Sequence, residues 1–424
     1  MKIEFKSPTP VKRLFVFLVL IFSLALTACP HEEENSPGPS TSLILISMDG
    51  FRWDYFDKTL TPNFDELIQT GAKAKALIPS FPTKTFPNHI TIVTGRYPEN
   101  HGIIANRMYD PVFDEYYYIG QGSAPVLDGK WYEAEPLWVT VEKQNQTAMT
   151  MFWPASKAEI MGVRPTEYFV YDGSVSHNDR VDQILKWLDY PASKRPQFIS
   201  TYFSHLDDVG HRYGPDSDEV KTAIRELDRT IGYLISGLKS RKLFHTVNIL
   251  LVSDHGMTTI SSDSMIFLDD YINMEYVDVI DWAPATAIRP KIHVDSIFNK
   301  LKNAHPKLRV YKKGDAPERL HYNTHRRIQP ITVIADEHWS ITTRDHFKKD
   351  NNVENYNGAT HGFDPIYPSL HGIFVGHGPA FKSGFQGPGI GNIHPYEMMC
   401  RILELKPAEN DGSADSTKVF LKKE

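Results

Sequence analysis

Hydrophobic runs that end in acidic or histidine residues are the feature that most constrains the fold of this 424-residue chain. Residues 43–46 lead into Asp49, residues 198–203 lead toward Asp207, and residues 247–252 run directly into Asp254. In an open parallel sheet, ligand-binding and catalytic groups gather in the crevice beyond the carboxyl ends of the strands. The sequence therefore predicts an α/β fold with a mostly parallel central sheet, flanked by helices, that carries these side chains at one edge.

The side chains in these runs have the chemistry of metal ligands. Together with a later Thr-His-Gly run they supply six candidates, which are Asp49, Asp207, His211, Asp254, His255 and His361. Mixed aspartate and histidine ligation suits zinc, and six ligands are enough for two ions held by three protein side chains each. We therefore expect two Zn²⁺ as the cofactors.

A candidate nucleophile lies in the stretch 80–95. Pro87 near the start and Gly95 just past the end of an apolar run predict a helix that begins at about Thr85. At that position the first backbone N–H groups are unpaired and the helix dipole is positive, which favours an alkoxide and an incoming phosphate. Thr85 is the predicted nucleophile, although a lone threonine at a helix start is more often only a cap.

Five sequence motifs, which follow one another along the chain in the order found in a known protein family, give a more specific indication. They are TFPNH at 85–89, YPENHGII at 97–104, GHRYGP at 210–215, SDHGM at 253–257 and MCRIL at 399–403. In these motifs the chain resembles the nucleotide pyrophosphatase/phosphodiesterase family of the alkaline-phosphatase superfamily, over about residues 43–413. The resemblance implies an alkaline-phosphatase-like core and a hydrolase that cleaves nucleotide phosphodiester or pyrophosphate bonds through a threonyl-phosphate intermediate.

The resemblance also implies how the candidate residues divide. One zinc would be held by Asp49, Asp254 and His255, with the Thr85 oxygen in its open position, and the other by Asp207, His211 and His361. Any single aspartate after a strand is more often a cap or turn residue, and most of the 18 histidines must have other roles. The six candidate ligands and Thr85 all occur in one chain and in the order of the family, which favours the catalytic interpretation.

Three further positions match substrate-binding residues of the family. Asn106 matches the asparagine that, with the backbone N–H of Thr85, holds a phosphate oxygen. Phe86 and Tyr171 match the aromatic pair that sandwiches a nucleobase, although aromatic residues are more often core. Lys157 follows Trp-Pro-Ala-Ser where nucleotide-cleaving relatives tend to carry an acid, which changes the charge beside the substrate.

Other functions remain open from sequence alone. The same chemistry could act on a choline-type or lipid phosphodiester. A phosphomonoesterase or sulfatase of the superfamily is a further alternative, but Ser80-Phe81-Pro82-Thr83-Lys84 lacks the arginine of the sulfatase motif. A non-enzymatic binding lipoprotein would not require Thr85 beside two metal triads.

The N-terminus predicts export. Four basic residues precede the apolar run 14–26, which is too short to span a hydrocarbon core of about 30 Å. We therefore expect a signal peptide over 1–28. The run 26–29 resembles a bacterial lipobox with Cys29 as the lipidated residue, and 29–41 is expected to be a flexible tether. These features predict a protein anchored in the bilayer of the bacterial cell envelope, at the periplasmic or surface face of the outer membrane.

Charge and cysteine content limit the partners. Loss of residues 1–28 removes four basic groups and one acidic group and moves the formal charge from −6 to −9. This balance argues against binding of duplex nucleic acid and leaves a small nucleotide or other phosphodiester as the expected partner. With Cys29 lipidated, Cys400 would have no disulfide partner. The oligomeric state is not predicted.

The spacing of the motifs also predicts how the chain is divided. Five of the candidate ligands precede Gly256, whereas His361 follows about a hundred residues later. The residues between have strand-like patterns at 285–288 and 328–334 and a helical pattern at 294–301. We expect a catalytic core of 42–261 and 358–424, with 262–357 as a small α+β insertion that caps the cleft.

Overall fold

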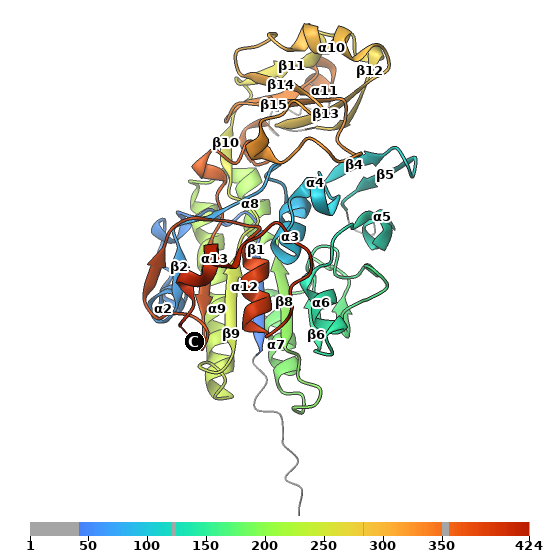
Figure 1. The fold of residues 1–424 in the computed structure, drawn as a ribbon. Coiled ribbons are helices and arrows are strands. Elements are labelled where there is room, and N and C mark those ends of the chain that lie inside the picture. The colour runs from blue at the N-terminus through green and yellow to red at the C-terminus, as the bar shows by residue number, and fades with distance from the viewer. Residues whose placement is uncertain (1–41, 121–123, 283, 350–355, 424) are drawn as a thin grey trace, which may run out of the picture. The chain divides into compact units, whose positions relative to one another are not determined.

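The computed structural model describes residues 42–120, 124–282, 284–349 and 356–423. An eight-stranded sheet has the order β19-β2-β18-β9-β1-β8-β6-β7 (Figure 1). Its strands are β1 (Leu43–Met48), β2 (Ala72–Ala74), β6 (Ala148–Met151), β7 (Glu167–Phe169), β8 (Phe198–Phe203), β9 (Asn248–Val252), β18 (Phe374–His377) and β19 (Phe385–Gly387). Only β18 among them runs antiparallel to its neighbours, β9 and β2. The predicted mostly parallel sheet is confirmed.

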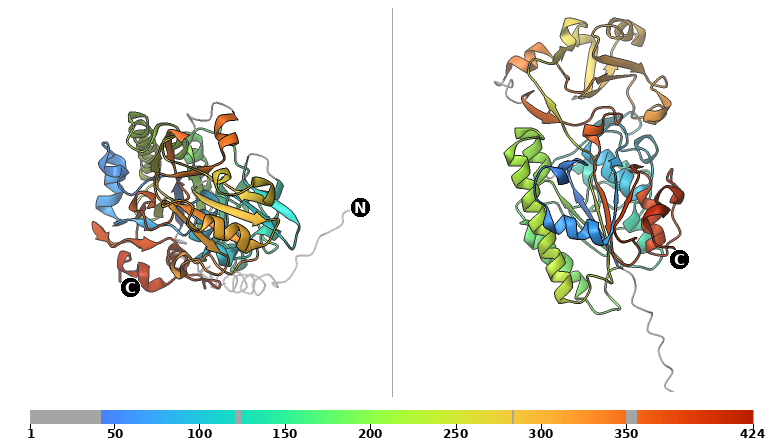
Figure 2. Two further views of the ribbon diagram at one scale, coloured as in Figure 1. Left: turned by 90° about the horizontal axis from the view of Figure 1, so that it is seen from above. Right: turned by 90° about the vertical axis from the view of Figure 1, so that its left-hand side faces the viewer.

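Helices cover both faces of this sheet (Figure 2). Alternate residues of β1 point to opposite faces, so that Ile44 and Ile46 join one apolar cluster and Leu43 and Leu45 join the other. The first cluster includes α2 (Pro62–Thr70), α7 (His177–Leu188) and α9 (Asp218–Ser240), and the second includes α3 (Thr85–Thr94), α6 (Leu137–Lys143) and α12 (Pro395–Ile402). Burial on both faces explains why the central strands are continuous hydrophobic runs.

A second, smaller sheet follows β9 in the chain. The antiparallel pair β10 (Thr258–Ile260) and β17 (Gly358–Thr360) lies at the two ends of this region. Between them, β12 (Val277–Asp281), β13 (Ala285–Pro290), β14 (Leu308–Lys312) and β15 (Ile331–Ala335) form an antiparallel sheet beside α10 (Val294–Leu301). The strand expected from residue 328 begins at Ile331, because Pro330 has no N–H to donate to a ladder. A separate apolar cluster fills this region.

Shorter elements connect these parts. Helix α8 (His205–Tyr213) follows β8, and the hairpin of β4 (Arg107–Asp110) and β5 (Glu115–Tyr118) contacts β12. The others are β3 (Leu77–Ile78), β11 (Met265–Phe267), β16 (Ser340–Thr342), β20 (Ile390–Gly391), α4 (Pro98–His101), α5 (Ala124–Leu127), α11 (Arg344–Lys348) and α13 (Ala414–Thr417).

Arg327 ties the segment before β15 to the first half of the chain. Its guanidinium is fully buried and donates to Asp110 at 2.6 Å and to Glu133 at 2.9 Å. It also donates to the backbone carbonyls of Gly102 and Trp131 at 2.7 and 2.8 Å. The neighbouring Arg326 reaches the same carboxylate of Asp110 from a position that is 33% exposed.

Replacement of Arg327 with methionine is expected to destabilise the protein by about 3–5 kcal/mol, because it leaves the buried Asp110 short of its closest cation. The change in the midpoint of urea unfolding measures the effect. Arg326→Met is the matched control and should cost clearly less, since its charge is partly solvated. Equal losses for the two variants would contradict the assignment of Arg327 as the main anchor.

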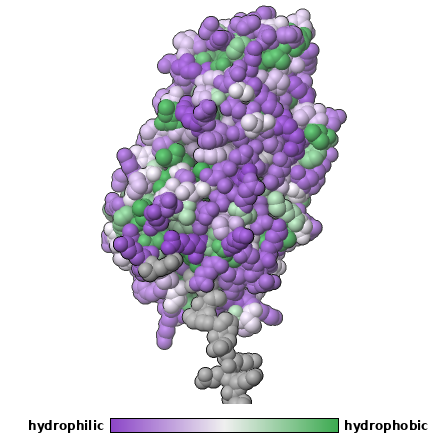
Figure 3. Space-filling model, viewed as in Figure 1, coloured by the Kyte–Doolittle hydropathy of each residue, from purple (hydrophilic) through white to green (hydrophobic). Residues whose placement is uncertain are grey.

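The N-terminal predictions concern residues outside the described part of the chain. These are the signal peptide 1–28, the lipidated Cys29 and the tether 29–41. In the described residues, no helix combines the length and apolarity needed to cross a membrane. The face in Figure 3 is mostly hydrophilic, with scattered apolar residues. Cys400 is buried in α12, and burial raises the pKa of its thiol to about 12.

Candidate metal and phosphate site

The first group of candidate ligands lies at the carboxyl ends of two adjacent strands. Asp49 follows β1, and Asp254 and His255 follow β9, so the parallel pairing of these strands brings all three together. The Nε2 atom of His255 lies 3.4 Å from Asp49 Oδ1 and 3.1 Å from Asp254 Oδ2. All three side chains are at most 2% exposed.

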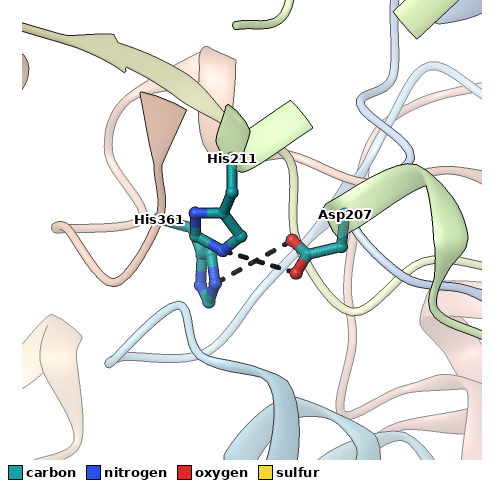
Figure 4. A group of neighbouring side chains, drawn as sticks. All are labelled: Asp207, His211 and His361. Carbon is teal, nitrogen blue, oxygen red and sulfur yellow. Dashed lines mark ion pairs between the residues drawn. The ribbon is translucent and has the colours of Figure 1, made fainter. Parts of the chain in front are cut away.

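The second group combines one helix with a distant loop (Figure 4). Asp207 and His211 are four residues apart on α8 and therefore share one face, with Nε2 of His211 3.3 Å from Asp207 Oδ2. His361 follows β17, and its Nε2 lies 3.9 Å from Asp207 Oδ1. His211 is the more exposed of the two histidines, because its side chain is 39% exposed and that of His361 is 10% exposed.

The two groups adjoin one another. The rings of His255 and His361 stack with centroids 3.6 Å apart. Gly50 permits the close approach of the Asp49 and Asp207 loops, because its φ is +67° and a Cβ there would lie 2.9 Å from Asp207 Oδ1. The two groups therefore form one continuous centre.

All three imidazoles are held in the orientation that metal ligands require. Each Nδ1 faces a backbone carbonyl, that of Ala359 for His211, Gly256 for His255 and Thr83 for His361, at 2.9, 2.9 and 2.8 Å. An Nδ1–H that donates to a carbonyl leaves Nε2 unprotonated. The Nε2 lone pairs thus face the carboxylates of their groups.

Buried oxygen atoms without partners support the same interpretation. In the described residues, Asp49 Oδ1, Asp207 Oδ1 and Asp254 Oδ2 are buried and accept no hydrogen bond. Burial raises the pKa of Asp49 well above its usual range, and the nearby Asp254 and Asp207 raise it further. Carboxylates crowded in this way need a cation, and a divalent metal reverses the repulsion. The residues present fit two metal ions with three protein ligands each.

Thr85 lies at the first turn of α3, next to the first group. Its Oγ1 is 3.4 Å from His255 Nε2 and the residue is 9% exposed. The helix begins at the predicted position, so the backbone N–H of Thr85 has no partner inside the helix. Asn106 Oδ1 accepts the backbone N–H of Phe86 at 3.1 Å. Within the described part of the chain its amide nitrogen makes no hydrogen bond and can donate to a phosphate oxygen.

A cavity of about 290 Å³ opens beside Thr85. Phe86 and Tyr171 both line it and make no ring contact with each other in the described residues. The Tyr171 hydroxyl is fixed by a 2.9 Å hydrogen bond to Ser204. Lys157 lines the same cavity, and burial lowers the pKa of its ammonium group. The structure thus places both predicted aromatic residues on the wall of one cavity.

The structure adds positioning residues that the sequence did not reveal. Tyr202 donates its hydroxyl to Asp49 Oδ2. The buried His89 faces the carbonyl of Thr85 with Nδ1 at 2.8 Å, and its Nε2 is 2.8 Å from the Ser47 hydroxyl. Tyr202 and Ser47 lie inside hydrophobic strand runs, where nothing in the sequence distinguishes them from core residues.

Comparison with known proteins agrees with this geometry. The model of the "Type I phosphodiesterase / nucleotide pyrophosphatase" family matches residues 43–364. The chain is 38% identical to human ectonucleotide pyrophosphatase/phosphodiesterase family member 5, over 94% of this chain and 81% of that protein. It is 37% identical to human bis(5′-adenosyl)-triphosphatase ENPP4, over 96% of this chain and 87% of the relative.

A solved structure gives the same result in three dimensions. Murine ectonucleotide pyrophosphatase/phosphodiesterase 5, in an inactive variant in complex with AMP, superposes with a TM-score of 0.85 at 36% identity, covering 90% of this chain and 100% of the murine one. The superposition confirms the predicted alkaline-phosphatase-like fold, with its mostly parallel sheet between helices. The chain belongs to the type I phosphodiesterase/nucleotide pyrophosphatase family.

Proposed function

We propose that the protein is a two-zinc phosphodiesterase/pyrophosphatase that hydrolyses nucleotide phosphodiester or pyrophosphate bonds and releases a nucleoside monophosphate. The observation that carries this proposal is the position of the Thr85 hydroxyl at two adjoining groups of candidate metal ligands. One group has two carboxylates and one imidazole, and the other has one carboxylate and two imidazoles. The aspartate and histidine ligands suit zinc.

In this proposal Thr85 is the nucleophile. When bound, the metal ions would lower the pKa of the Thr85 hydroxyl and offset the charge of the phosphate. Thr85 Oγ1 loses its proton to solvent and forms a bond to phosphorus while the bond to the leaving oxygen breaks. Water then adds to phosphorus, the bond between Oγ1 and phosphorus breaks, and Oγ1 takes up a proton. In this proposal the Asn106 amide nitrogen and the backbone N–H of Thr85 bind the phosphate oxygens.

The cavity that Phe86 and Tyr171 line supports a nucleotide as the substrate, and the AMP bound by the murine relative is consistent with it. Wild-type enzyme is expected to cleave p-nitrophenyl nucleotide esters faster than p-nitrophenylphosphocholine or p-nitrophenyl phosphate. Phe86→Ala or Tyr171→Ala should raise KM for the nucleotide ester by the equivalent of about 1–3 kcal/mol of lost stacking.

Bis-p-nitrophenyl phosphate is the matched control substrate, because it lacks a nucleobase and should be little affected by either variant. The alternative, a choline-ester enzyme, would use its aromatic residues as a cage for a quaternary ammonium group. The ammonium group of Lys157 in the same cavity opposes that alternative. A wild-type preference for the phosphocholine ester, or equal losses on both substrate types, would contradict the nucleotide assignment.

The remaining proposals concern location and organisation. The sequence of residues 1–41 supports export and anchoring of the protein in the bacterial cell envelope through a lipidated Cys29. The β10–β17 pair supports 262–357 as an insertion within a catalytic core of 42–261 and 358–424. Mass analysis of the membrane fraction for a diacylglyceryl-modified Cys29 tests the anchor.

A further inference from the structure

Thr83, two residues before the candidate nucleophile, is buried and bonded to the loop that follows β17. Its side chain hydroxyl donates to the carbonyl of Phe363 at 3.1 Å and accepts the backbone N–H of Gly362 at 2.9 Å. The carbonyl of Thr83 faces His361 Nδ1 at 2.8 Å. The loop that carries one candidate metal ligand therefore also holds the chain next to Thr85.

Lys84, the residue directly before Thr85, is held by the insertion at 262–357. Its side chain is 6% exposed, and its ammonium group pairs with Asp281, the last residue of β12. Lys84 Nζ also donates to the carbonyl of Trp282 at 3.2 Å. The charge of Asp281 depends on the same contact, because burial raises the pKa of its carboxyl group and Lys84 opposes that rise.

The backbone of Lys84 connects this ion pair to the start of α3. Its carbonyl accepts the backbone N–H of Asn88 at 3.2 Å and the side-chain amide of Asn88 at 2.8 Å. Lys84 caps α3, and Thr85 is the first residue of the helix. The lysine stem is closely packed, since a Cβ at Gly362 would lie 3.2 Å from Lys84 Cε. A shift of the Lys84 side chain therefore displaces the first turn of α3, which carries the nucleophile.

Lys84 is not placed to bind the substrate itself. Thr85 lines a cavity of about 290 Å³ and His211 lines another of about 880 Å³, and Lys84 belongs to the described wall of neither. Attachment of the insertion does not depend on Lys84 alone, because the buried Arg327 separately ties the segment before β15 to Asp110. The ion pair thus joins the insertion to the nucleophile rather than to the bulk of the core.

We propose that Lys84 is a positioning residue for the reaction, and that its ion pair with Asp281 holds Thr85 in line with the scissile phosphate. The insertion is then part of the catalytic machinery, because it supplies the partner of this lysine. Displacement of a reacting group by about 1 Å can lower a rate about a hundredfold. This inference rests on the proposed function and adds to it a residue that contacts neither cavity.

Two variants remove the ion pair from opposite sides. Asp281→Asn is nearly isosteric, and Lys84→Met keeps most of the side-chain stem. In a single turnover of the p-nitrophenyl ester of AMP labelled at phosphorus, quenched with acid, each variant should label Thr85 about tenfold or more slowly than wild type. The double variant should lose no more than the slower single variant, because both changes act through one pair. Binding of AMP, measured by calorimetry, should stay within about twofold.

Asp278→Asn is the matched control on β12. This carboxylate lies three residues before Asp281, is 36% exposed, and pairs with Arg289 and Lys291 at 3.0 Å each. Its loss should leave the labelling rate unchanged. Lys84→Arg keeps the positive charge and should be clearly faster than Lys84→Met. Zinc content and the midpoint of urea unfolding are measured for every variant, so that positioning is separated from metal binding and from stability.

Labelling within about twofold of the wild-type rate in folded Asp281→Asn and Lys84→Met would overturn the inference, even with lowered urea midpoints, because the pair would then serve stability alone. Loss of zinc from both variants would also overturn it, since metal loss would then explain the slower step. In either case the wild-type enzyme would still be labelled, and the proposed function would stand. Zinc-loaded wild-type enzyme that cleaves no nucleotide ester and acquires no label would instead contradict the proposed function, and the inference with it.

Discussion

Replacement of Thr85 with alanine is expected to reduce turnover of nucleotide substrates by at least about a thousandfold, since it deletes the group that forms the covalent intermediate. The side chain is small and lies at a helix start, and within the described residues its hydroxyl has a hydrogen-bonding contact only with His255. The fold and the metal content should therefore be retained. Steady-state kinetics and metal analysis of the purified variant measure both expectations.

Thr85→Ser is the matched control, because it keeps a hydroxyl at the same position and should retain much of the activity. Trapping adds a direct test: brief incubation with substrate labelled at the α-phosphate, followed by acid quenching, should label wild-type enzyme but not Thr85→Ala. Activity of Thr85→Ala within tenfold of wild type would exclude Thr85 as the nucleophile.

The second large effect is expected from loss of a metal ligand. His361→Ala should reduce the zinc content from two ions per chain to one and lower turnover by at least about a hundredfold, the size of effect caused by loss of one charge-stabilising group. His361 is fixed by its own Nδ1 contact to Thr83 and by stacking on His255, so the variant removes a positioned ligand.

His245→Ala is the matched control, since this exposed histidine follows α9 and belongs to neither group. It should bind two ions and turn over substrate as wild type does. Chelation of wild-type enzyme should abolish activity, and zinc should restore it. One zinc per wild-type chain, or an unchanged count in His361→Ala, would contradict the two-ion assignment.

Sequence reasoning located the parts of the site that depend on local signals. Asp49 and Asp254 directly follow buried strands, and parallel pairing of β1 with β9 is enough to bring them together. Thr85 is at a helix start marked by Pro87 and Gly95. The structure gathers all six ligand candidates into the two expected groups.

The rest of the site depends on contacts that no local pattern encodes. Tyr202 is one of six buried residues of β8, and only the register of β8 against β1 brings its hydroxyl to Asp49. Arg212 and Trp282 are 70 positions apart in the sequence, and neither stands in a pattern that would relate it to the other. Both nevertheless line one cavity of about 880 Å³, so only the tertiary fold brings them together.

The position of His361 has a consequence for synthesis. Five of the six candidate ligands, Asp49, Asp207, His211, Asp254 and His255, are synthesised before residues 262–357, and His361 only afterwards. A nascent chain that has emerged as far as β15 holds one full set of three ligands and one set of two. Under the proposed mechanism, catalytic competence is therefore withheld until β17 pairs with β10 and His361 Nδ1 reaches the carbonyl of Thr83. Under the proposed mechanism, chains that terminate before His361 would stay inert toward nucleotides, and they would also lack β18 and β19 of the central sheet.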